Sequence, residues 1–358
     1  MPHRLDTTRL YRSRARQLVL ASLRSFAEQC RRGFAEARAV TFPASFRKID
    51  QVVVVGMGGS ALGSDVIRSV FFDQLRLPLT VVNGYALPRS VTSRTLVILS
   101  SYSGTTEEVL AAAASAHRHR ARITGLTVGG PLGTWFRRHQ LPWYRIDGGA
   151  NPAGQPRLGL GYSIMGQLGL LAGLGLIRLP GRAVTSLAAY LERRAWDFDV
   201  ARPKRTNPAK QLAVTLRTSL PIVVGAEHLS GSVHAMANQL NETAKTLAVP
   251  FQLPELNHHL LEGLRWPRAV RQATMVLFRS DLYHRRVATR VRVTAELAER
   301  AGLRATVVPV HGMDRLTQAF DLLVFAGYVS LYLAVVHGVD PLAIPTVDEL
   351  KRRLHRAA

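Results

Sequence analysis

The feature that most constrains the fold of this 358-residue chain is a repeated alternation of short apolar runs with stretches of helical spacing. In the first half, the apolar runs predict strands at 52–55, 79–82, 96–99, 123–128 and 143–146. Helices are expected between them at 60–72, 105–117 and 132–139. Continuous Val, Ile and Leu strands separated by helices are typical of a parallel sheet covered on both faces, so the sequence predicts an α/β fold.

The same alternation resumes in the second half of the chain. Further strands are expected at 222–224, 274–278 and 306–310, with helices at 233–247, 286–301, 319–336 and 347–355. We therefore expect four parts: an N-terminal helical segment 1–48, a first α/β domain 49–177, a linker 178–204 and a second α/β domain with C-terminal helices 205–358. The polar linker is predicted to contain an exposed helix at 184–194. Each α/β unit then has an ordinary domain size.

The charge of the chain is strongly positive, with a formal net charge of +23. Such a charge raises the question of nucleic-acid binding, because phosphate backbones attract Lys and Arg clusters. The arginines are scattered along the chain, however, and no nucleic-acid-binding motif accompanies them. Nucleic acid is therefore an unlikely primary partner, whereas a positive field suits a small anionic substrate.

The number of cysteines and the apolar stretches of the chain indicate its cellular compartment. The single cysteine, Cys30, excludes an internal disulfide and fits a reducing compartment. The first thirty residues carry arginines throughout and lack the apolar core of a signal peptide. Two uncharged stretches could suggest membrane spans, but 158–177 is rich in glycine and 322–336 is short for a bilayer. We therefore expect both to be buried helices of the protein. The sequence predicts a cytoplasmic protein with no membrane partner.

The stretch GMGGSALGSD at 56–65 follows the first strand and resembles a phosphate-binding turn. A dinucleotide fingerprint needs an acidic residue at the end of the next strand, where this chain has Asn83. A Walker loop needs Gly-Lys followed by Ser or Thr, but the residues here are Gly59-Ser60-Ala61. Both nucleotide interpretations are weakened, and a plain strand-to-helix turn stays an alternative.

The stretch SSYSGTTEEV at 100–109 also joins an apolar strand to a helix. It places Ser101, Ser103, Thr105 and Thr106 at a helix N-terminus, where free N–H groups favour an anion. Hydroxyls and amides without a lysine or a metal ligand suit one phosphate monoester. The alternative is an N-cap by Ser103 or Thr105, but a cap needs only one hydroxyl.

Taken together, these stretches resemble the sugar-phosphate loops of the sugar isomerase (SIS) domain family. NQLNETAK at 238–245, PELNHH at 254–259 and GVDPLAIPTVDELKRRL at 338–354 narrow the resemblance to the bifunctional phosphoglucose/phosphomannose isomerases. That resemblance implies two SIS subdomains, each a flavodoxin-like parallel-sheet sandwich. It also implies an enzyme that interconverts glucose 6-phosphate, and mannose 6-phosphate, with fructose 6-phosphate through a cis-enediolate.

The resemblance also implies roles for particular residues. The phosphate-binding set is Gly58, Gly59, Ser60, Ser101, Ser103 and Thr106. The catalytic set is Glu242 as the base, His258 for ring opening from the neighbouring subunit of a homodimer, Arg157 for the enediolate, and Lys351 near the ring oxygen.

Several alternatives to these roles stay open. His259 stands where the family more often has Asn and competes with His258. The apolar neighbours of Glu242 predict a mostly buried helix, although a surface pair with Lys245 is possible at that spacing. Lys351, beside Arg352, can also be read as part of a solvated charge run.

No cofactor and no metal are expected, because the His pairs lack Cys or carboxylate partners at ligand spacing. A phosphorylated hexose is the predicted partner. Two rival functions stay open: an isomerase of another phosphosugar, and a regulator that binds a sugar phosphate without turnover. A sensor needs the Ser/Thr loops but does not need Glu242, His258 and Arg157. The sequence does not decide between the glucose and mannose epimers.

Overall fold

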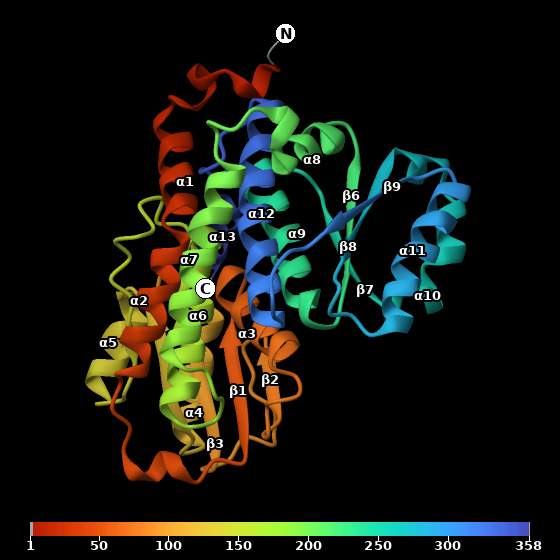
Figure 1. Cartoon of the computed structure of the whole chain (residues 1–358). Helices are drawn as coiled ribbons and strands as arrows, with labels where there is room; N and C mark the ends of the chain where they lie inside the picture. The colour runs from red at the N-terminus through yellow and green to blue at the C-terminus, as the bar shows by residue number, and fades with distance from the viewer. Residues whose placement is uncertain (1–2, 358) are drawn as a thin grey trace.

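The computed structural model describes residues 3–357 and contains two parallel sheets with a layer of helices between them (Figure 1). The first sheet has the order β2-β1-β3-β4-β5 and the second has the order β7-β6-β8-β9. The strands of the first sheet are β1 Gln51–Gly56, β2 Leu79–Val82, β3 Thr95–Ser100, β4 Arg122–Thr127 and β5 Tyr144–Arg145. Those of the second are β6 Leu220–Ala226, β7 Val249–Leu253, β8 Ala273–Arg279 and β9 Arg304–Pro309.

The helices alternate with these strands and also form both ends of the chain (Figure 1). Those up to the second sheet are α1 Arg14–Arg24, α2 Phe26–Arg38, α3 Gly59–Val70, α4 Glu107–Arg118, α5 Gly130–Arg138, α6 Leu160–Gly173, α7 Gly181–Phe198 and α8 Pro208–Leu216. The rest are α9 Ser230–Ala244, α10 Leu256–His259, α11 Arg285–Arg300, α12 Arg315–His337 and α13 Pro345–Ala357. A short 3₁₀ helix, η4 (Pro156–Leu158), precedes α6.

The side chains of the first sheet divide between two cores, as alternation along a strand requires. Val53 and Val55 of β1 face the outer helices α4 and α5, in a small core with Phe136. Val52 and Val54 face the helices between the sheets, in a large core that also includes the second sheet. This large core is continuous from one sheet to the other. The domain boundaries expected at 49–177 and 205–358 stay a prediction.

The expected strands all occur, and the predicted α/β fold is confirmed. One strand, β7, was not expected. It lies at the edge of the second sheet, is mostly half-buried and contains Pro250, which a central strand would not tolerate. The prediction of an exposed helix at 184–194 is wrong. Helix α7 covers that range and buries Val184, Leu187 and Leu191 against α2 and α12.

Helix α12 is long and apolar enough to cross a membrane, by length and composition alone. It begins after Asp314, whose side chain accepts a hydrogen bond from the Thr317 amide, and ends at Gly338 in a left-handed conformation. Of its most apolar window, 94 % is buried inside the protein. It is therefore a central core helix, and α6 is buried along nearly its whole length in the same way.

Helices α3 and α9 bring the two halves of the chain together. The His234 ring nitrogen Nδ1 on α9 lies 2.8 Å from the Asp65 carboxylate on α3. Further along α9, the Gln239 side chain donates a hydrogen bond to the backbone carbonyl of Arg157, in η4. The C-terminal end of α9 therefore reaches the segment that lies beside the first sheet.

Candidate active site

The two loops that the sequence singles out meet at one edge of the first sheet. Strands β1 and β3 are parallel neighbours, so the loops after Gly56 and Ser100 leave the sheet side by side. The Ser60 hydroxyl accepts a hydrogen bond from the Tyr102 amide at 3.0 Å. The Ser100 hydroxyl donates to the Ser60 carbonyl at 2.9 Å. The structure thus joins both loops into one surface.

Neither loop caps the helix that follows it with a side chain. Gly58 is the N-cap of α3, and Thr106 is the N-cap of α4 without a side-chain capping bond. The Thr106 hydroxyl instead lies 2.8 Å from the Ser101 hydroxyl, and the Ser103 hydroxyl lies 2.9 Å from that of Thr105. Helix N-termini without caps, lined by hydroxyls, are suited to binding an anion.

Two glycines fix the shape of this surface. Gly104 has φ +74°, and a side chain there would collide with the carbonyl of Gly129. Gly59 lies so close to Pro156 and Arg157 that a Cβ would come within 3.1 Å of the Arg157 amide nitrogen. Position 104 therefore needs glycine, and the close approach at Gly59 puts the first loop in direct contact with η4. Among the predicted phosphate ligands, Gly58 and Ser103 are exposed, Thr106 is half-buried, and Gly59, Ser60 and Ser101 are buried.

Arg157 is the most elaborately bonded side chain of the site, and it is 1 % exposed. Its Nε donates to Thr243 at 3.1 Å, and its Nη1 donates to Gln155 and to the Glu242 carboxylate at 3.0 and 3.2 Å. Its Nη2 donates to the backbone carbonyls of Pro341 and Leu342, at 3.0 and 2.8 Å. Burial lowers the pKa of Arg157 from its ordinary value, while Glu242 opposes that shift. An arginine still remains a cation in this setting.

Glu242 lies on the last turn of α9, and its side chain is 31 % exposed. The predicted mostly buried helix is confirmed, because most residues of α9 are buried, and Glu242 lies on its half-buried face with His234 and Asn238. Partial exposure leaves the carboxylate accessible to a small molecule, while Arg157 fixes one of its oxygens.

No hydrogen bond or ion pair joins the side chain of His258 or Lys351 to Glu242 among residues 3–357. His258 is exposed on α10, and no side-chain hydrogen bond of His258 occurs among residues 3–357. His259 is instead paired with Glu255 at 2.8 Å. Asn257 fastens this segment to α11 through Thr294 and Arg290. Lys351 is exposed on α13.

Sequence reasoning missed three contributors to this site. Thr243 and Gln155 hold the Arg157 guanidinium, and the turn at Pro341 and Leu342 closes over it. Lys245, three residues after Glu242, was considered only as a surface partner of that carboxylate. The motif NETAK at 241–245 was the one signal that could have indicated Thr243 and Lys245.

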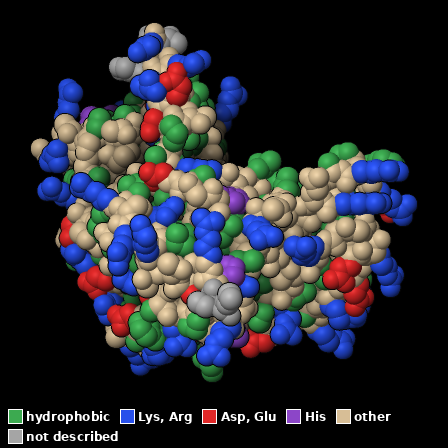
Figure 2. All heavy atoms as spheres, turned by 90° about the horizontal axis from the view of Figure 1, so that it is seen from above, with side chains coloured by type: hydrophobic (Ala, Val, Ile, Leu, Met, Phe, Trp, Pro, Cys, Tyr) green, Lys and Arg blue, Asp and Glu red, His purple; other side chains and the backbone are tan. Residues whose placement is uncertain are grey.

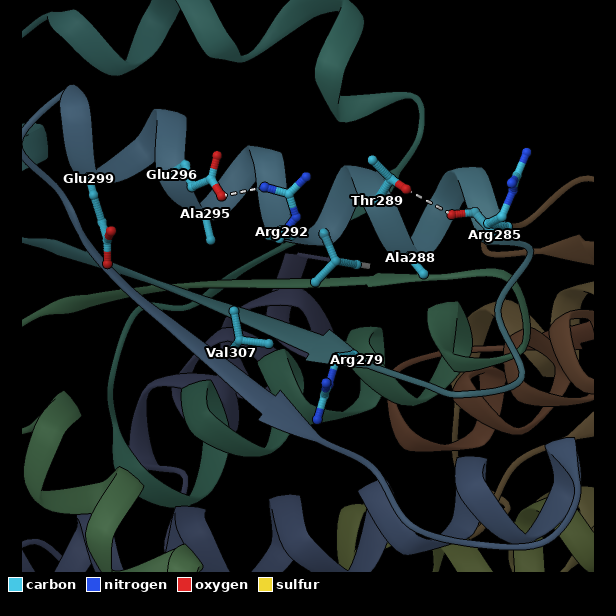
Figure 3. A pocket seen from close by; sticks show the side chains of 10 residues that line it. Arg279, Arg285, Ala288, Thr289, Arg292, Ala295, Glu296, Glu299 and Val307 are labelled. Atoms are coloured by element: carbon cyan, nitrogen blue, oxygen red, sulfur yellow. Dashed lines mark hydrogen bonds and ion pairs between the residues drawn. The ribbon is translucent and has the colours of Figure 1, made fainter.

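A groove of about 740 Å³ lies elsewhere, between α11 and the strands β8 and β9 (Figure 3). Arg292 and Glu296 form an ion pair along its rim, and Val307 of β9 lies opposite. It contains none of the predicted site residues. On the face seen in Figure 2, Lys and Arg side chains are spread over the whole surface. That distribution agrees with the scattered arginines of the sequence.

No group of three or more His, Cys, Asp and Glu side chains suited to a metal ion occurs within the described residues 3–357. The expectation of metal-independent chemistry stays a prediction.

Comparison with known proteins assigns the family. The model of the bacterial phospho-glucose isomerase C-terminal SIS domain matches residues 205–354. The bifunctional phosphoglucose/phosphomannose isomerase of Caldicellulosiruptor bescii is 32 % identical over 94 % of this chain and 98 % of its own length. The chain belongs to the bifunctional phosphoglucose/phosphomannose isomerase family. As a member of that family it is an isomerase, and the predicted resemblance is confirmed.

A more distant member of the same family, from Thermoplasma volcanium, is 27 % identical over 88 % of this chain and 95 % of its own length. Among solved structures, a hypothetical protein from Thermus thermophilus has a TM-score of 0.74 at 18 % identity, covering 96 % of this chain and 93 % of its own. That likeness shows that the fold of this chain also occurs in a solved structure.

Proposed function

We propose that this chain interconverts glucose 6-phosphate and mannose 6-phosphate with fructose 6-phosphate. One observation carries the proposal: a carboxylate held by a buried arginine, Glu242 with Arg157, lies beside the η4 segment that contacts the Gly59 loop. That arrangement provides an anion site and a fixed base on adjoining elements. The names of the relatives support the choice of hexose phosphates.

The phosphate is proposed to bind at the uncapped N-termini of α3 and α4, with Gly58, Gly59, Ser60, Ser101, Ser103 and Thr106 as ligands. Binding the distant phosphate orients the reacting end of the sugar, which lowers the entropic cost of reaction.

Glu242 is proposed as the base. It removes the proton from C2 of the open-chain aldose. The electron pair forms the C1–C2 double bond, and the π pair of the C1 carbonyl moves to the C1 oxygen to give a cis-enediolate. The same carboxylate, now protonated, returns the proton to C1. The hydroxyl proton of the C2 oxygen passes to the C1 oxygen, and the C2 oxygen becomes the carbonyl of fructose 6-phosphate. The positive charge of Arg157 stabilises the negative charge that develops during these steps.

His258 is proposed to open the pyranose ring in the neighbouring subunit of a homodimer, and Lys351 to assist near the ring oxygen. The exposure of His258, with no bonding partner among residues 3–357, supports a role outside its own subunit. His259, by contrast, is engaged by Glu255. We also propose a cytoplasmic location.

Side-by-side coupled assays with glucose 6-phosphate and mannose 6-phosphate test this function. Each assay measures the fructose 6-phosphate that forms. Turnover of both aldoses is the expected result. Binding of fructose 6-phosphate without turnover of either aldose would instead identify a sugar-phosphate regulator.

A further inference from the structure

Arg157 cannot by itself donate hydrogen bonds to the substrate, because its N–H groups are already bonded within the protein. A guanidinium has five N–H donors. In Arg157 all of them are used, by Thr243, Gln155, Glu242 and the two backbone carbonyls of the 341–342 turn. Arg157 therefore positions Glu242 and the C-terminal turn, and it has no donor left for a substrate oxygen.

Lys245 is a second cation at the same end of α9. Its Nζ donates to the backbone carbonyl of Glu242 at 2.6 Å, which turns the side chain back over the last turn of the helix. An ammonium group has three donors. Because no other hydrogen bond or ion pair of the Lys245 side chain occurs among residues 3–357, two of these donors are open to a ligand.

The backbone at Lys245 is also unusual. Lys245 closes α9 in the left-handed conformation, with φ +54°, where helices usually have Gly or Asn. A lysine in this conformation is strained, because its Cβ approaches the following carbonyl oxygen. Residues held in such conformations cluster at functional sites.

The electrostatic surroundings of Lys245 agree with a place inside the site. Burial and the nearby Arg157 charge lower the pKa of Lys245, while Asp340 and Glu242 act in the opposite direction. The charge of Lys245 therefore interacts with both members of the Arg157–Glu242 pair and with Asp340, which precedes the 341–342 turn. Two positive charges that both interact with Glu242 create a field that favours an anionic intermediate.

We propose that Lys245 is a catalytic residue that donates hydrogen bonds to the oxygens on C1 and C2 and stabilises the enediolate. The inference rests on the proposed function and specifies which group of the site contacts the charge that develops. Lys245 keeps its protons throughout, and Glu242 alone transfers the hydrogen between the two carbons.

The test compares Lys245→Met and Lys245→Asn with the parent enzyme. Asn is well suited to the left-handed conformation, so Lys245→Asn removes the amine while preserving the end of the helix. Lys48→Met is the matched control, because Lys48 is exposed in the segment before β1, at the opposite end of the strand from the site. Turnover is measured together with calorimetric binding of 5-phospho-D-arabinonate, whose carboxylate mimics the enediolate oxygens, and of inorganic phosphate.

We expect both Lys245 variants to lose about 10²- to 10³-fold in kcat, and a tenfold or greater part of their affinity for the arabinonate. Phosphate affinity should stay within about threefold of the parent value in both variants. Unchanged arabinonate affinity, or a kcat within about threefold of the parent, would overturn the proposal. A parent enzyme that turns over neither aldose would refute the proposed function instead, and the arabinonate measurement would still decide the role of Lys245.

Discussion

Arg157 and Glu242 are 85 residues apart in the chain, yet the guanidinium Nη1 lies 3.2 Å from the carboxylate Oε2. Arg157 belongs to the segment after the first sheet, and Glu242 belongs to the helix after the first strand of the second sheet. The same guanidinium binds the carbonyls of Pro341 and Leu342. Three distant parts of the chain must therefore fold together before the site exists.

Glu242→Gln tests the proposed base while keeping the size of the side chain and an oxygen for Arg157. We expect kcat to fall by about 10³-fold or more, because an amide cannot accept the C2 proton. The affinity for fructose 6-phosphate should stay within about tenfold, since the phosphate ligands are unchanged. Steady-state kinetics and calorimetry measure the two quantities. Glu299→Gln, in the groove beside α11, is the matched control, and retained turnover in Glu242→Gln would remove this residue from the mechanism.

Ser103→Ala tests the anion site. Ser103 is exposed in the loop before α4, and its hydroxyl lies beside that of Thr105. Loss of one hydrogen bond to a charged group should raise KM by about tenfold or more, with kcat within about threefold. Ser115→Ala, near the other end of α4, should leave KM unchanged. An unaltered KM in Ser103→Ala would place the phosphate elsewhere.

Arg157→Lys tests whether the planar shape of the guanidinium organises the site. Lysine has three donors in place of five and cannot bind the carboxylate and two carbonyls in one plane. We expect a loss of about 3 kcal/mol in the free energy of unfolding, because buried partners are left unsatisfied, and a fall in kcat. Urea denaturation and kinetics check both effects. Arg31→Lys, on the exposed surface of α2, is the control, and equal stability of the two variants would contradict this role.

The fold was largely predictable from the sequence because continuous apolar runs and helical spacing are local signals. The strand at 249–253 was not predictable, because Pro250 and half-burial at a sheet edge conceal it. The expectation that the helix at 184–194 is exposed was wrong for another reason. Its buried partners, α2 and α12, lie far away in the sequence, so local polarity suggested a solvated segment.

Only those residues of the candidate site that lie in short sequence motifs were predictable. The serine and threonine loops, Arg157 and Glu242 were each singled out from short stretches of sequence. The contacts between them were not, since Arg157 reaches Leu342 across 185 residues. Lys245 was underestimated because a lysine three residues after a glutamate usually indicates a surface pair. The left-handed backbone at its position was visible only in the structure.

Mixing two inactive variants tests whether His258 acts across a subunit interface. A mixed dimer of Glu242→Gln and His258→Ala has one site with both intact residues, whereas each pure dimer has none. After the two variants are unfolded and refolded together, roughly a quarter of the parent activity should return. Refolding each variant by itself is the control. Failure of the mixture to recover activity above either variant would contradict a shared site.

Chelation tests the predicted independence from metal. Incubation with EDTA followed by desalting should leave the rate within about twofold of the untreated enzyme, because the proposed steps use protein side chains alone. A loss of activity that zinc or magnesium restores would contradict this prediction. Elemental analysis of the treated protein confirms that the metal has been removed.

The most direct measurement of the central claim is isomerisation of fructose 6-phosphate in deuterated water, followed by NMR at C2 of the aldose products. If the Glu242 carboxylate transfers the proton through an enediolate, prolonged incubation with the parent enzyme should place solvent deuterium at C2, and Glu242→Gln should incorporate almost none. Full conversion to an aldose that keeps protium at C2, or equal incorporation by Glu242→Gln, would contradict the account.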